Sequence, residues 1–548
     1  MKLTQIVVLF AFAATWLTGF PGYTRAGQAL RDASLQCDSL SRQDFSQLQD
    51  APTRIVATRL VAATKEEPSY CQVEGYIWPH IGFELRLPIS SWNGKFFEVG
   101  CGGGCGSTNW KFWCPMRRGY ACIASDMGHR SDDSDSFLWA YNNLQAQLDL
   151  DSRAPHATAL AGKAITERYY SKAANYAYFM GCSNGGTQAL IEAQRFPWDF
   201  NGIIGIAGSP SKSDISVEIL WWLRSLRDDA GQPLLSHHDL QLVHSEVLAQ
   251  CDLDDGVKDG VVSDPYHCHV NLSELACRND GKTKCLKEAQ IEAVRRIYEG
   301  PLVASGDVRN YIRGEPPGTE LGWLDNSQER WVQEVFRYWA FTPPPGARWS
   351  MRDFDFSRDY KRLGVAETLW DASNPDLRKF RDAGGKLLFA HGLSDADVAP
   401  GGEMDYYEMV ERTMGGRQPT QKFARLFVIP GMQHCTGGAG AFAIDYVGYL
   451  EAWVEAGQAP DKLIGAHVDS SYLQSLARRE LPQPRTGQES PTDDELTTAG
   501  AFLLMATFPL DSQVPVTFTR PIYPYPVWAK YKGQGDPTKA ESFKAVTP

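Results

Sequence analysis

The chain of 548 residues has little positive charge for its length. Lysine and arginine number 54 against 66 aspartate and glutamate residues, so the formal net charge is −12 at pH 7. The basic residues are not gathered into a stripe. Because nucleic-acid grooves and anionic membrane surfaces are bound through clustered Lys and Arg, neither is expected as the main partner.

Several sequence signatures are absent as well. The chain has no internal repeat, no heptad pattern, no dinucleotide-binding fingerprint and no P-loop. These absences argue against a solenoid, a coiled coil and the common nucleotide-binding folds. Beyond the N-terminal segment, no apolar run is long enough to cross a bilayer.

The one notable apolar run lies at the N-terminus. Lys2 precedes the apolar residues 6–16, and a small-residue cleavage site ends at about Ala26. This pattern predicts a signal peptide over residues 1–26. An uncleaved membrane anchor is the alternative, but the run is short and soon broken by glycine and proline.

Cysteine, in contrast, is plentiful, with twelve residues in the chain. An even number of cysteines behind a signal peptide predicts a disulfide framework formed in an oxidising compartment. We therefore expect a secreted or periplasmic protein that is not inserted in a membrane once its signal is removed.

The most informative segment is Gly181-Cys182-Ser183-Asn184-Gly185, which fits the pattern G-x-S-x-G. Residues 176–180 before it are apolar and aromatic, as in a buried strand, and residues 187–196 after it are good helix formers. Strand, small-residue turn and helix in this order are typical of a nucleophile elbow, in which glycines let the helix pack closely. The alternative is a buried structural turn without a catalytic role.

A serine nucleophile needs a general base and an acid that orients it, in the chain order Ser, Asp or Glu, His. The apolar strand 386–390 opens into a loop that carries Asp395 and, as a rival acid, Asp397. The next apolar strand leads to His434. The sequence thus predicts a triad of Ser183, Asp395 and His434.

The spacing of these residues predicts an α/β-hydrolase fold with an inserted domain, because the gap between Ser183 and Asp395 far exceeds one strand-helix unit. We expect a catalytic domain from residues 27–210 and 377–548 and a lid from residues 211–376. The lid is rich in aromatic side chains that would suit flat substrates, or would only build the lid's own core. We therefore assign no substrate contact to any of the lid aromatics, which are Trp323, Trp331, Phe336, Tyr338, Trp339, Phe341 and Trp349.

Two cysteines adjoin the predicted triad. Cys182 precedes Ser183, and Cys435 follows His434. A disulfide between them would draw the two loops together, since its Cα atoms lie about 4.4–6.8 Å apart. This arrangement resembles the tannase and feruloyl esterase family, whose members carry a Cys-Ser and a His-Cys pair joined by a disulfide. Other segments also resemble family motifs: Trp92-Asn93-Gly94-Lys95-Phe96, Asp126-Met127-Gly128-His129 and the terminal Tyr525-Pro526 to Tyr531-Lys532-Gly533.

The resemblance implies further site residues. It favours Asp395 over Asp397 as the triad acid, and it implies that the backbone N–H groups of Gly103 and Asn184 form the oxyanion hole. For the disulfides, it implies the pairs Cys37 with Cys71, Cys182 with Cys435, Cys251 with Cys268, and Cys277 with Cys285. The remaining cysteines leave three pairings open, and disulfides are expected there rather than a metal site: Cys101, Cys105, Cys114 and Cys122.

Residues 251–261 alternate acids with glycine turns, a composition that hard cations prefer. The loop is not an EF-hand, because the twelfth position counted from Asp252 is not glutamate. The resemblance implies a structural Ca²⁺ held by the side chains of Asp252, Asp255 and Asp259 and the carbonyls of Val257 and Val261. An acidic turn without metal is the alternative.

The resemblance implies a serine esterase acting on small esters of aromatic acids such as ferulate, coumarate or gallate. The sequence does not choose among them, and relatives of this architecture include hydrolases of terephthalate monoesters. Two other functions are weighed: cleavage of a carbon–carbon bond in an aromatic polyketide, and a ligand-binding scaffold without catalysis. The complete triad argues against the scaffold. The oligomeric state is left open.

Overall fold

The computed structural model describes residues 32–64, 67–277, 284–305, 308–324, 326–480, 490–509 and 513–547. The expected signal peptide, residues 1–26, lies outside the described residues. None of the helices within these ranges is both long and apolar enough to cross a membrane.

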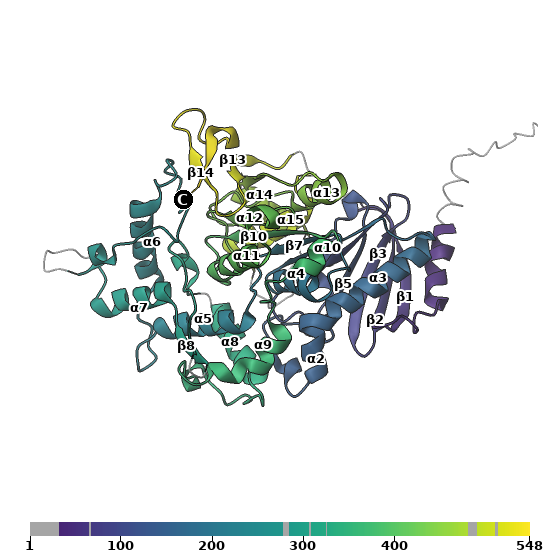
Figure 1. Ribbon diagram of the computed structural model, residues 1–548, viewed down its shortest axis with the longest axis horizontal. Helices are drawn as coiled ribbons and strands as arrows, with labels where there is room; N and C mark the ends of the chain where they lie inside the picture. The colour runs from purple at the N-terminus through teal and green to yellow at the C-terminus, as the bar shows by residue number, and fades with distance from the viewer. Residues whose placement is uncertain are drawn as a thin grey trace, which may run out of the picture.

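A nine-stranded sheet forms the centre of the molecule, in the order β1-β2-β3-β5-β4-β6-β7-β10-β11 (Figure 1). The strands β1, β2, β3 and β5 pair antiparallel, whereas β5, β4, β6, β7, β10 and β11 pair parallel. This mixed sheet, covered by helices, confirms the α/β class. The strands are β1 Thr53–Val61, β2 Tyr70–Ile77, β3 Ile81–Pro88, β4 Lys95–Val99, β5 Ala121–Ser125, β6 Tyr176–Cys182, β7 Gly202–Ile206, β10 Lys386–Gly392 and β11 Ala424–Ile429.

Three two-stranded sheets lie outside the central one. They are β8 Leu302–Ser305 with β9 Val308–Tyr311, β12 Leu463–Val468 with β13 Val516–Ile522, and β14 Trp528–Tyr531 with β15 Phe543–Val546. The helices are α2 Leu144–Leu148, α3 Ala154–Tyr170, α4 Asn184–Arg195, α5 Lys212–Ser225, α6 His237–Cys251, α7 Glu288–Glu299, α8 Asn326–Tyr338, α9 Gly364–Trp370, α10 Arg378–Asp382, α11 Gly401–Thr413, α12 Arg417–Thr420, α13 Tyr446–Ala456, α14 Ser470–Glu480 and α15 Asp493–Thr507.

The core has two parts because neighbouring side chains of a strand point to opposite faces of the sheet. Phe179 and Leu387 join the apolar cluster that includes residues of α3, α4 and α11. Tyr178 and Leu388 join the second cluster, with residues of α13, α14 and α15. Strands buried on both faces explain the continuous apolar runs in the sequence.

The inserted segment leaves the sheet after β7 and returns at β10. These two strands are parallel neighbours, with Ile203 of β7 paired with Leu387 of β10. Helices α5 to α9 and the β8–β9 hairpin lie beside the sheet (Figure 1). The expected lid limits at residues 211 and 376 fall just before α5 and α10. Five of the seven lid aromatics are buried in the apolar core, namely Trp323, Phe336, Trp339, Phe341 and Trp349.

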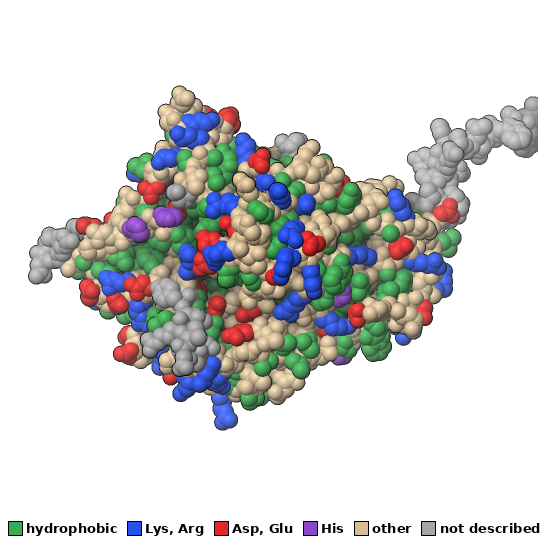
Figure 2. All heavy atoms as spheres, viewed as in Figure 1, with side chains coloured by type: hydrophobic (Ala, Val, Ile, Leu, Met, Phe, Trp, Pro, Cys, Tyr) green, Lys and Arg blue, Asp and Glu red, His purple; other side chains and the backbone are tan. Residues whose placement is uncertain are grey.

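On the face seen in Figure 2, basic side chains are interspersed with acidic ones.

Candidate active site

Ser183 sits at the turn between β6 and α4. Its backbone angles, φ 59° and ψ −119°, fall where an L-residue is strained. The N–H of Ser183 donates to the Ile206 carbonyl at 2.9 Å, which fixes the turn against β7. A Cβ on Gly181 would lie 2.3 Å from the carbonyl oxygen of Gly185, so only glycine fits there. The strand, strained serine and helix form the expected nucleophile elbow.

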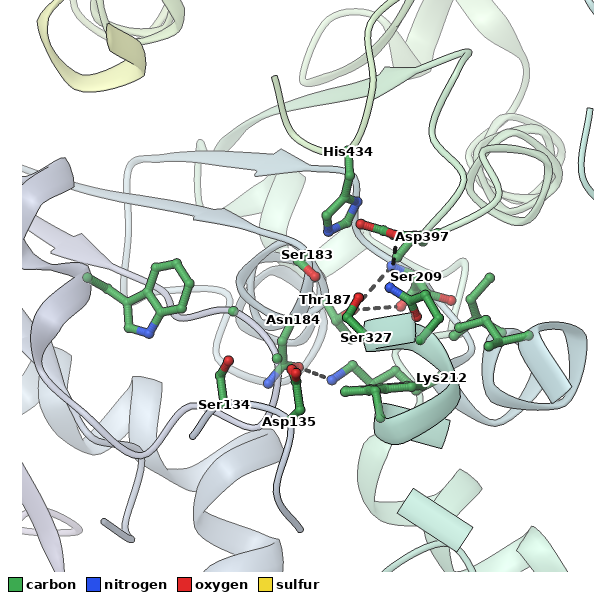
Figure 3. Close-up of a pocket in the computed structure, with 18 residues that line it drawn as sticks. Ser134, Asp135, Ser183, Asn184, Thr187, Ser209, Lys212, Ser327, Asp397 and His434 are labelled. Carbon is green, nitrogen blue, oxygen red and sulfur yellow. Dashed lines mark hydrogen bonds between the residues drawn. The ribbon is translucent and has the colours of Figure 1, made fainter. Parts of the chain in front are cut away.

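The structure brings His434 to a buried carboxylate. His434 Nδ1 lies 2.8 Å from Oδ2 of Asp395, whose side chain is fully buried. The backbone N–H groups of Asp397 and Val398 donate to Asp395 Oδ1, both at 2.9 Å. His434 and Ser183 line the same cavity, with the serine hydroxyl below the imidazole (Figure 3).

The rival acid has a different partner. Asp397 Oδ1 accepts a hydrogen bond at 2.8 Å from Nε2 of Gln328, in lid helix α8. The carboxylate bound to His434 Nδ1 is that of Asp395. The geometry therefore favours Asp395 as the residue that orients the imidazole.

Electrostatic interactions keep Asp395 ionised and favour proton uptake by His434. Burial by itself raises the pKa of Asp395. The charge of His434 and the hydrogen bonds from His391 and His434 outweigh burial, so the pKa of Asp395 is below its usual value. Burial lowers the pKa of His434, but the Asp395 carboxylate outweighs this and raises it above its usual value. Asp395 thus stays ionised and stabilises an imidazolium.

A second histidine lies behind Asp395, and sequence reasoning missed it. His391 Nδ1 is 2.8 Å from Glu403 Oε2, and its Nε2 is 2.9 Å from the Val398 carbonyl and 3.4 Å from Asp395 Oδ2. Burial lowers the pKa of His391, but hydrogen bonds to the two carboxylates raise it to about 10. A histidine four residues before Asp395 was the signal that could have found it.

The predicted disulfide beside the triad is present. Cys182 and Cys435 are bonded, with their Cα atoms 5.9 Å apart, and thereby tie the serine turn to the histidine loop across 253 residues of sequence. The other three pairs implied by the resemblance also form. The four open cysteines pair as Cys101 with Cys105 and Cys114 with Cys122.

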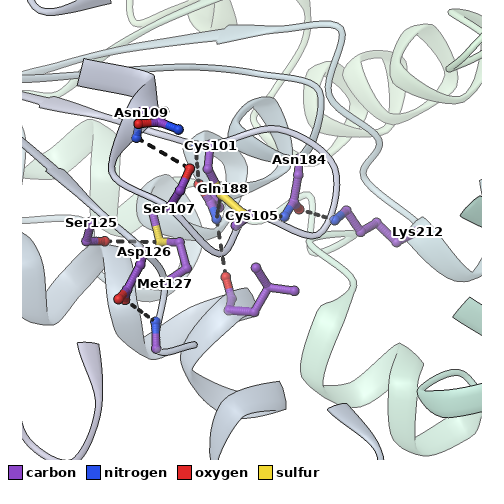
Figure 4. The surroundings of a disulfide bond; sticks show 12 residues. Cys101, Cys105, Ser107, Asn109, Ser125, Asp126, Met127, Asn184, Gln188 and Lys212 are labelled. Atoms are coloured by element: carbon purple, nitrogen blue, oxygen red, sulfur yellow. Dashed lines mark hydrogen bonds between the residues drawn. A yellow bond between two sulfur atoms is a disulfide. The ribbon is translucent and has the colours of Figure 1, made fainter. Parts of the chain in front are cut away.

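The Cys101–Cys105 disulfide closes a glycine-rich loop beside the elbow (Figure 4). The N–H of Cys101 donates to Gln188 Oε1 of α4 at 3.3 Å, and Nδ2 of Asn184 donates to Cys105 Sγ at 3.4 Å. Gly103 and Asn184 line the cavity together with Ser183. Loop and helix N-terminus therefore meet where an oxyanion hole is needed.

The cavity at Ser183 has a volume of about 220 Å³ and lies between sheet and lid. Its apolar lining includes Trp110, Ile215, Ile219, Trp331 and Val398. Its polar lining includes Ser134, Asp135, Ser209, Lys212, Ser327 and Gln328. Sequence reasoning named none of these as site residues, because no motif marks them.

The acidic loop of residues 251–261 carries carboxylate oxygens, several of which accept hydrogen bonds from the loop's own backbone. Asp252 Oδ1 accepts from the N–H groups of Asp259 and Gly260, both at 3.1 Å, and Asp255 Oδ1 accepts from Val257 N–H at 2.9 Å. Asp259 Oδ2 lies 2.7 Å from Arg520 Nη2.

The donor set of this loop suits a hard cation. Asp259 Oδ1 is buried and has no hydrogen-bond partner among the described residues, and Asp255 and Asp259 border a cavity of about 40 Å³. Within the described part of the chain, the three aspartates do not converge to within 4.8 Å; the group that does is Cys182, His434 and Cys435, whose cysteines are disulfide-bonded.

A strained serine, a buried aspartate and a histidine, in this chain order on a largely parallel sheet, define an α/β hydrolase. The family model "Tannase and feruloyl esterase" matches residues 63–349 and 347–546. The chain therefore belongs to the tannase and feruloyl esterase family, as its motifs indicated.

Relatives and solved structures agree. The chain is 30% identical over 571 residues to mono(2-hydroxyethyl) terephthalate hydrolase of Piscinibacter sakaiensis, covering 90% of this chain and 87% of that protein. It is 32% identical over 448 residues to a probable feruloyl esterase of Arthroderma benhamiae, covering 73% and 80%.

Among solved structures, feruloyl esterase B from Aspergillus oryzae superposes with a TM-score of 0.77 at 23% identity, covering 93% of this chain and 99% of that one. Tannin acyl hydrolase from Aspergillus niger superposes with a TM-score of 0.71 at 19% identity, covering 94% and 96%. At these identities the likeness shows the fold, and it confirms the α/β-hydrolase prediction.

Proposed function

We propose that this protein is a secreted serine carboxylic-ester hydrolase that acts on small esters of aromatic acids. The observation that carries the proposal is the His434–Asp395 hydrogen bond of 2.8 Å at the cavity that also holds Ser183. The relatives named as feruloyl esterase and terephthalate monoester hydrolase support an aromatic acyl group. The tryptophan and isoleucine wall of the cavity suits a flat ring.

The reaction is a two-step acyl transfer. Ser183 attacks the ester carbonyl while His434 takes the hydroxyl proton and returns it to the leaving alcohol, and Asp395 holds the imidazole in place. Water, activated by His434, then cleaves the acyl-enzyme. The N–H groups of Gly103 and Asn184 bind the oxyanion, and losing one such donor typically raises the barrier by about 3 kcal/mol.

The inserted segment, residues 211–376, acts as a lid over this chemistry. Lys212, Ile215 and Trp331 close the cavity opposite Ser183. Lid contacts with the ligand would then set the choice of acid, as is common for sites between domains. Six disulfides among the described residues support folding in an oxidising compartment, hence secretion or a periplasmic location.

We also propose that the acidic loop binds a structural calcium ion. The side chains of Asp252, Asp255 and Asp259 and the carbonyls of Val257 and Val261 would hold it, and the buried, unpartnered Oδ1 of Asp259 supports this. The ion would stabilise the loop against Arg520 and the C-terminal strands and would supply no catalytic chemistry.

Calcium removal should therefore lower thermal stability. We expect the melting temperature to fall on dialysis against EDTA, to recover with Ca²⁺, and to be insensitive to EDTA in Asp255→Asn. The starting sample is protein freed of zinc and loaded with calcium. If its melting temperature is the same before and after EDTA, the loop needs no metal.

An ester panel tests the esterase. Purified protein and Ser183→Ala are assayed on methyl ferulate, methyl coumarate, methyl gallate and a terephthalate monoester. We expect wild-type protein to release at least one acid and Ser183→Ala to release almost none. No release from any ester by well-folded protein would reject the proposal and return weight to carbon–carbon cleavage or ligand binding.

A further inference from the structure

Lys212, the first residue of lid helix α5, carries a buried ammonium group in the cavity of Ser183. Its side chain is only 5% exposed. Its Nζ donates to Oδ1 of Asn184, the residue after the nucleophile, and lies 4.7 Å from the centre of the Trp370 ring. Burying an ammonium is costly unless it is partnered, and Lys212 meets this condition while its ammonium group borders the cavity.

Asp135 lines the same cavity, and in Figure 3 its side chain points toward Asn184 and the end of Lys212. The cavity thus offers a cationic donor and an anionic acceptor near each other. Trp110 and Trp331 supply flat apolar surfaces to the lining of the same cavity. A group that both accepts and donates hydrogen bonds at the end of an aromatic ring is complementary to this arrangement.

We propose that Lys212 and Asp135 bind a phenolic hydroxyl on the ring of the acyl group and thereby select hydroxylated aromatic acids. The Lys212 ammonium donates to the phenol oxygen, and the phenol O–H donates to the Asp135 carboxylate. A ring carboxylate would accept from Lys212 but would meet the like charge of Asp135 without a proton to offer it. This inference rests on the proposed esterase function.

Matched substrates separate this role from a merely structural one. Wild-type protein should hydrolyse methyl 4-hydroxycinnamate with a kcat/KM about 10- to 100-fold above that of methyl cinnamate, the range for a hydrogen bond to a charged group. Lys212→Met and Asp135→Asn should each reduce this ratio toward one, with the larger loss on the hydroxylated ester. Lys386→Met, on the first residue of β10, is the matched control and should leave the ratio unchanged.

Three results would overturn the inference. Equal kcat/KM values on both esters in wild-type protein would show that the protein does not recognise the hydroxyl. An equal loss on both esters in a folded Lys212→Met would assign the lysine to holding Asn184 alone. Preference for a terephthalate monoester that Lys212→Met abolishes would assign the ammonium to a carboxylate. No hydrolysis of any ester by wild-type protein would instead reject the esterase itself.

A second inference comes from a separate observation, the buried contacts behind the triad. His391 spans from Glu403 of α11, at 2.8 Å, to Asp395, at 3.4 Å, and Asp395 contacts His434 at 2.8 Å. His391 and Glu403 are both almost completely buried. We infer that His391 and Glu403 are positioning residues that hold Asp395 ionised and aligned with His434.

The charged groups that face His391 of β10 are Glu403 from α11, Asp395 from the loop after β10, and His434 beyond Asp395. The carboxyl of Glu315 from the lid also faces Asp395. A positive His391 lowers the pKa of His434 by like-charge repulsion. Removing that charge should therefore raise the pKa of His434 and move the acid limb of the kcat/KM profile to higher pH.

The test compares the variants His391→Gln and Glu403→Gln. The second variant keeps a side-chain oxygen that accepts a hydrogen bond from His391. We expect His391→Gln to lower kcat about tenfold or more and to shift the acid limb upward, and Glu403→Gln to have the smaller effect on both. Folding is checked by melting temperature. A His391→Gln protein with a lower melting temperature but an unchanged pH profile and kcat would show a packing role only.

Discussion

Ser183 and Lys212 face the same cavity, but the two sides of that cavity are held in different ways. On the sheet side, the serine turn and the histidine loop are fixed by a disulfide, by the buried Asp395 and by backbone hydrogen bonds. On the lid side, Trp331 and Gln328 project from α8, and Gln328 reaches the sheet side through Asp397. The contrast indicates that the sheet side carries the chemistry and the lid side the choice of substrate.

Substituting the two loop acids one at a time tests which of them orients His434. Asp395→Asn should lower kcat about 10⁴-fold, because an amide leaves the imidazole in the wrong tautomer. Asp397→Asn should cost less than about tenfold, since it alters a contact to Gln328. Steady-state kinetics of both variants decide, and a greater loss in Asp397→Asn would transfer the role of triad acid to Asp397.

The disulfide tests whether the sheet side depends on a covalent tie. Cys182→Ala with Cys435→Ala should lower kcat about 100-fold, because a small misplacement of base and nucleophile has effects of that size. Removing a native disulfide also typically costs about 2–5 kcal/mol of stability. The matched control is Cys114→Ala with Cys122→Ala, which removes a disulfide away from the triad. Turnover that stays at the wild-type rate in the first variant would show that the bridge does not position the triad.

The pH profile tests the charge balance of the same side. His434 must be neutral to act as base, and Asp395 raises its pKa above the usual value. The acid limb of kcat/KM should therefore have its midpoint above about pH 6.5, with a tenfold fall for each pH unit below it. A midpoint below pH 6 would contradict the assigned contact between the two residues.

A lid substitution should have the smallest effect and act on binding. Trp331→Ala should raise KM about 3- to 10-fold with little change in kcat, because it removes one face of the aromatic wall. Phe336→Leu, in the lid core, is the control for general loosening of the lid. A fall in kcat with KM unchanged would place Trp331 in the chemistry rather than in substrate binding.

The sequence was a good guide to the sheet side for a physical reason. A nucleophile elbow requires glycines, a serine and flanking strand and helix within a few residues, so Ser183 is visible locally. Asp395 and His434 each follow an apolar strand that ends at the same edge of the sheet. The choice between Asp395 and Asp397 needed the family resemblance, because both lie on one loop.

The lid side was not predictable in the same way. Lys212 and Gln328 belong to the lid and Asp135 to the catalytic domain, and only the packing of lid on sheet brings the three side chains to one cavity. The pairings of Cys101 with Cys105 and of Cys114 with Cys122 likewise depend on distances in space. Most lid aromatics proved to be core residues, which composition alone could not separate from substrate contacts.

Trapping the acyl-enzyme tests whether Ser183 is the nucleophile. Wild-type protein and Ser183→Ala are quenched with acid during turnover of methyl ferulate, or of whichever panel ester is hydrolysed, and their peptides are analysed by mass spectrometry. The account predicts an acyl adduct on the peptide that contains Ser183 in wild-type protein, and none in Ser183→Ala. An adduct on another residue, or hydrolysis that persists in Ser183→Ala, would contradict it.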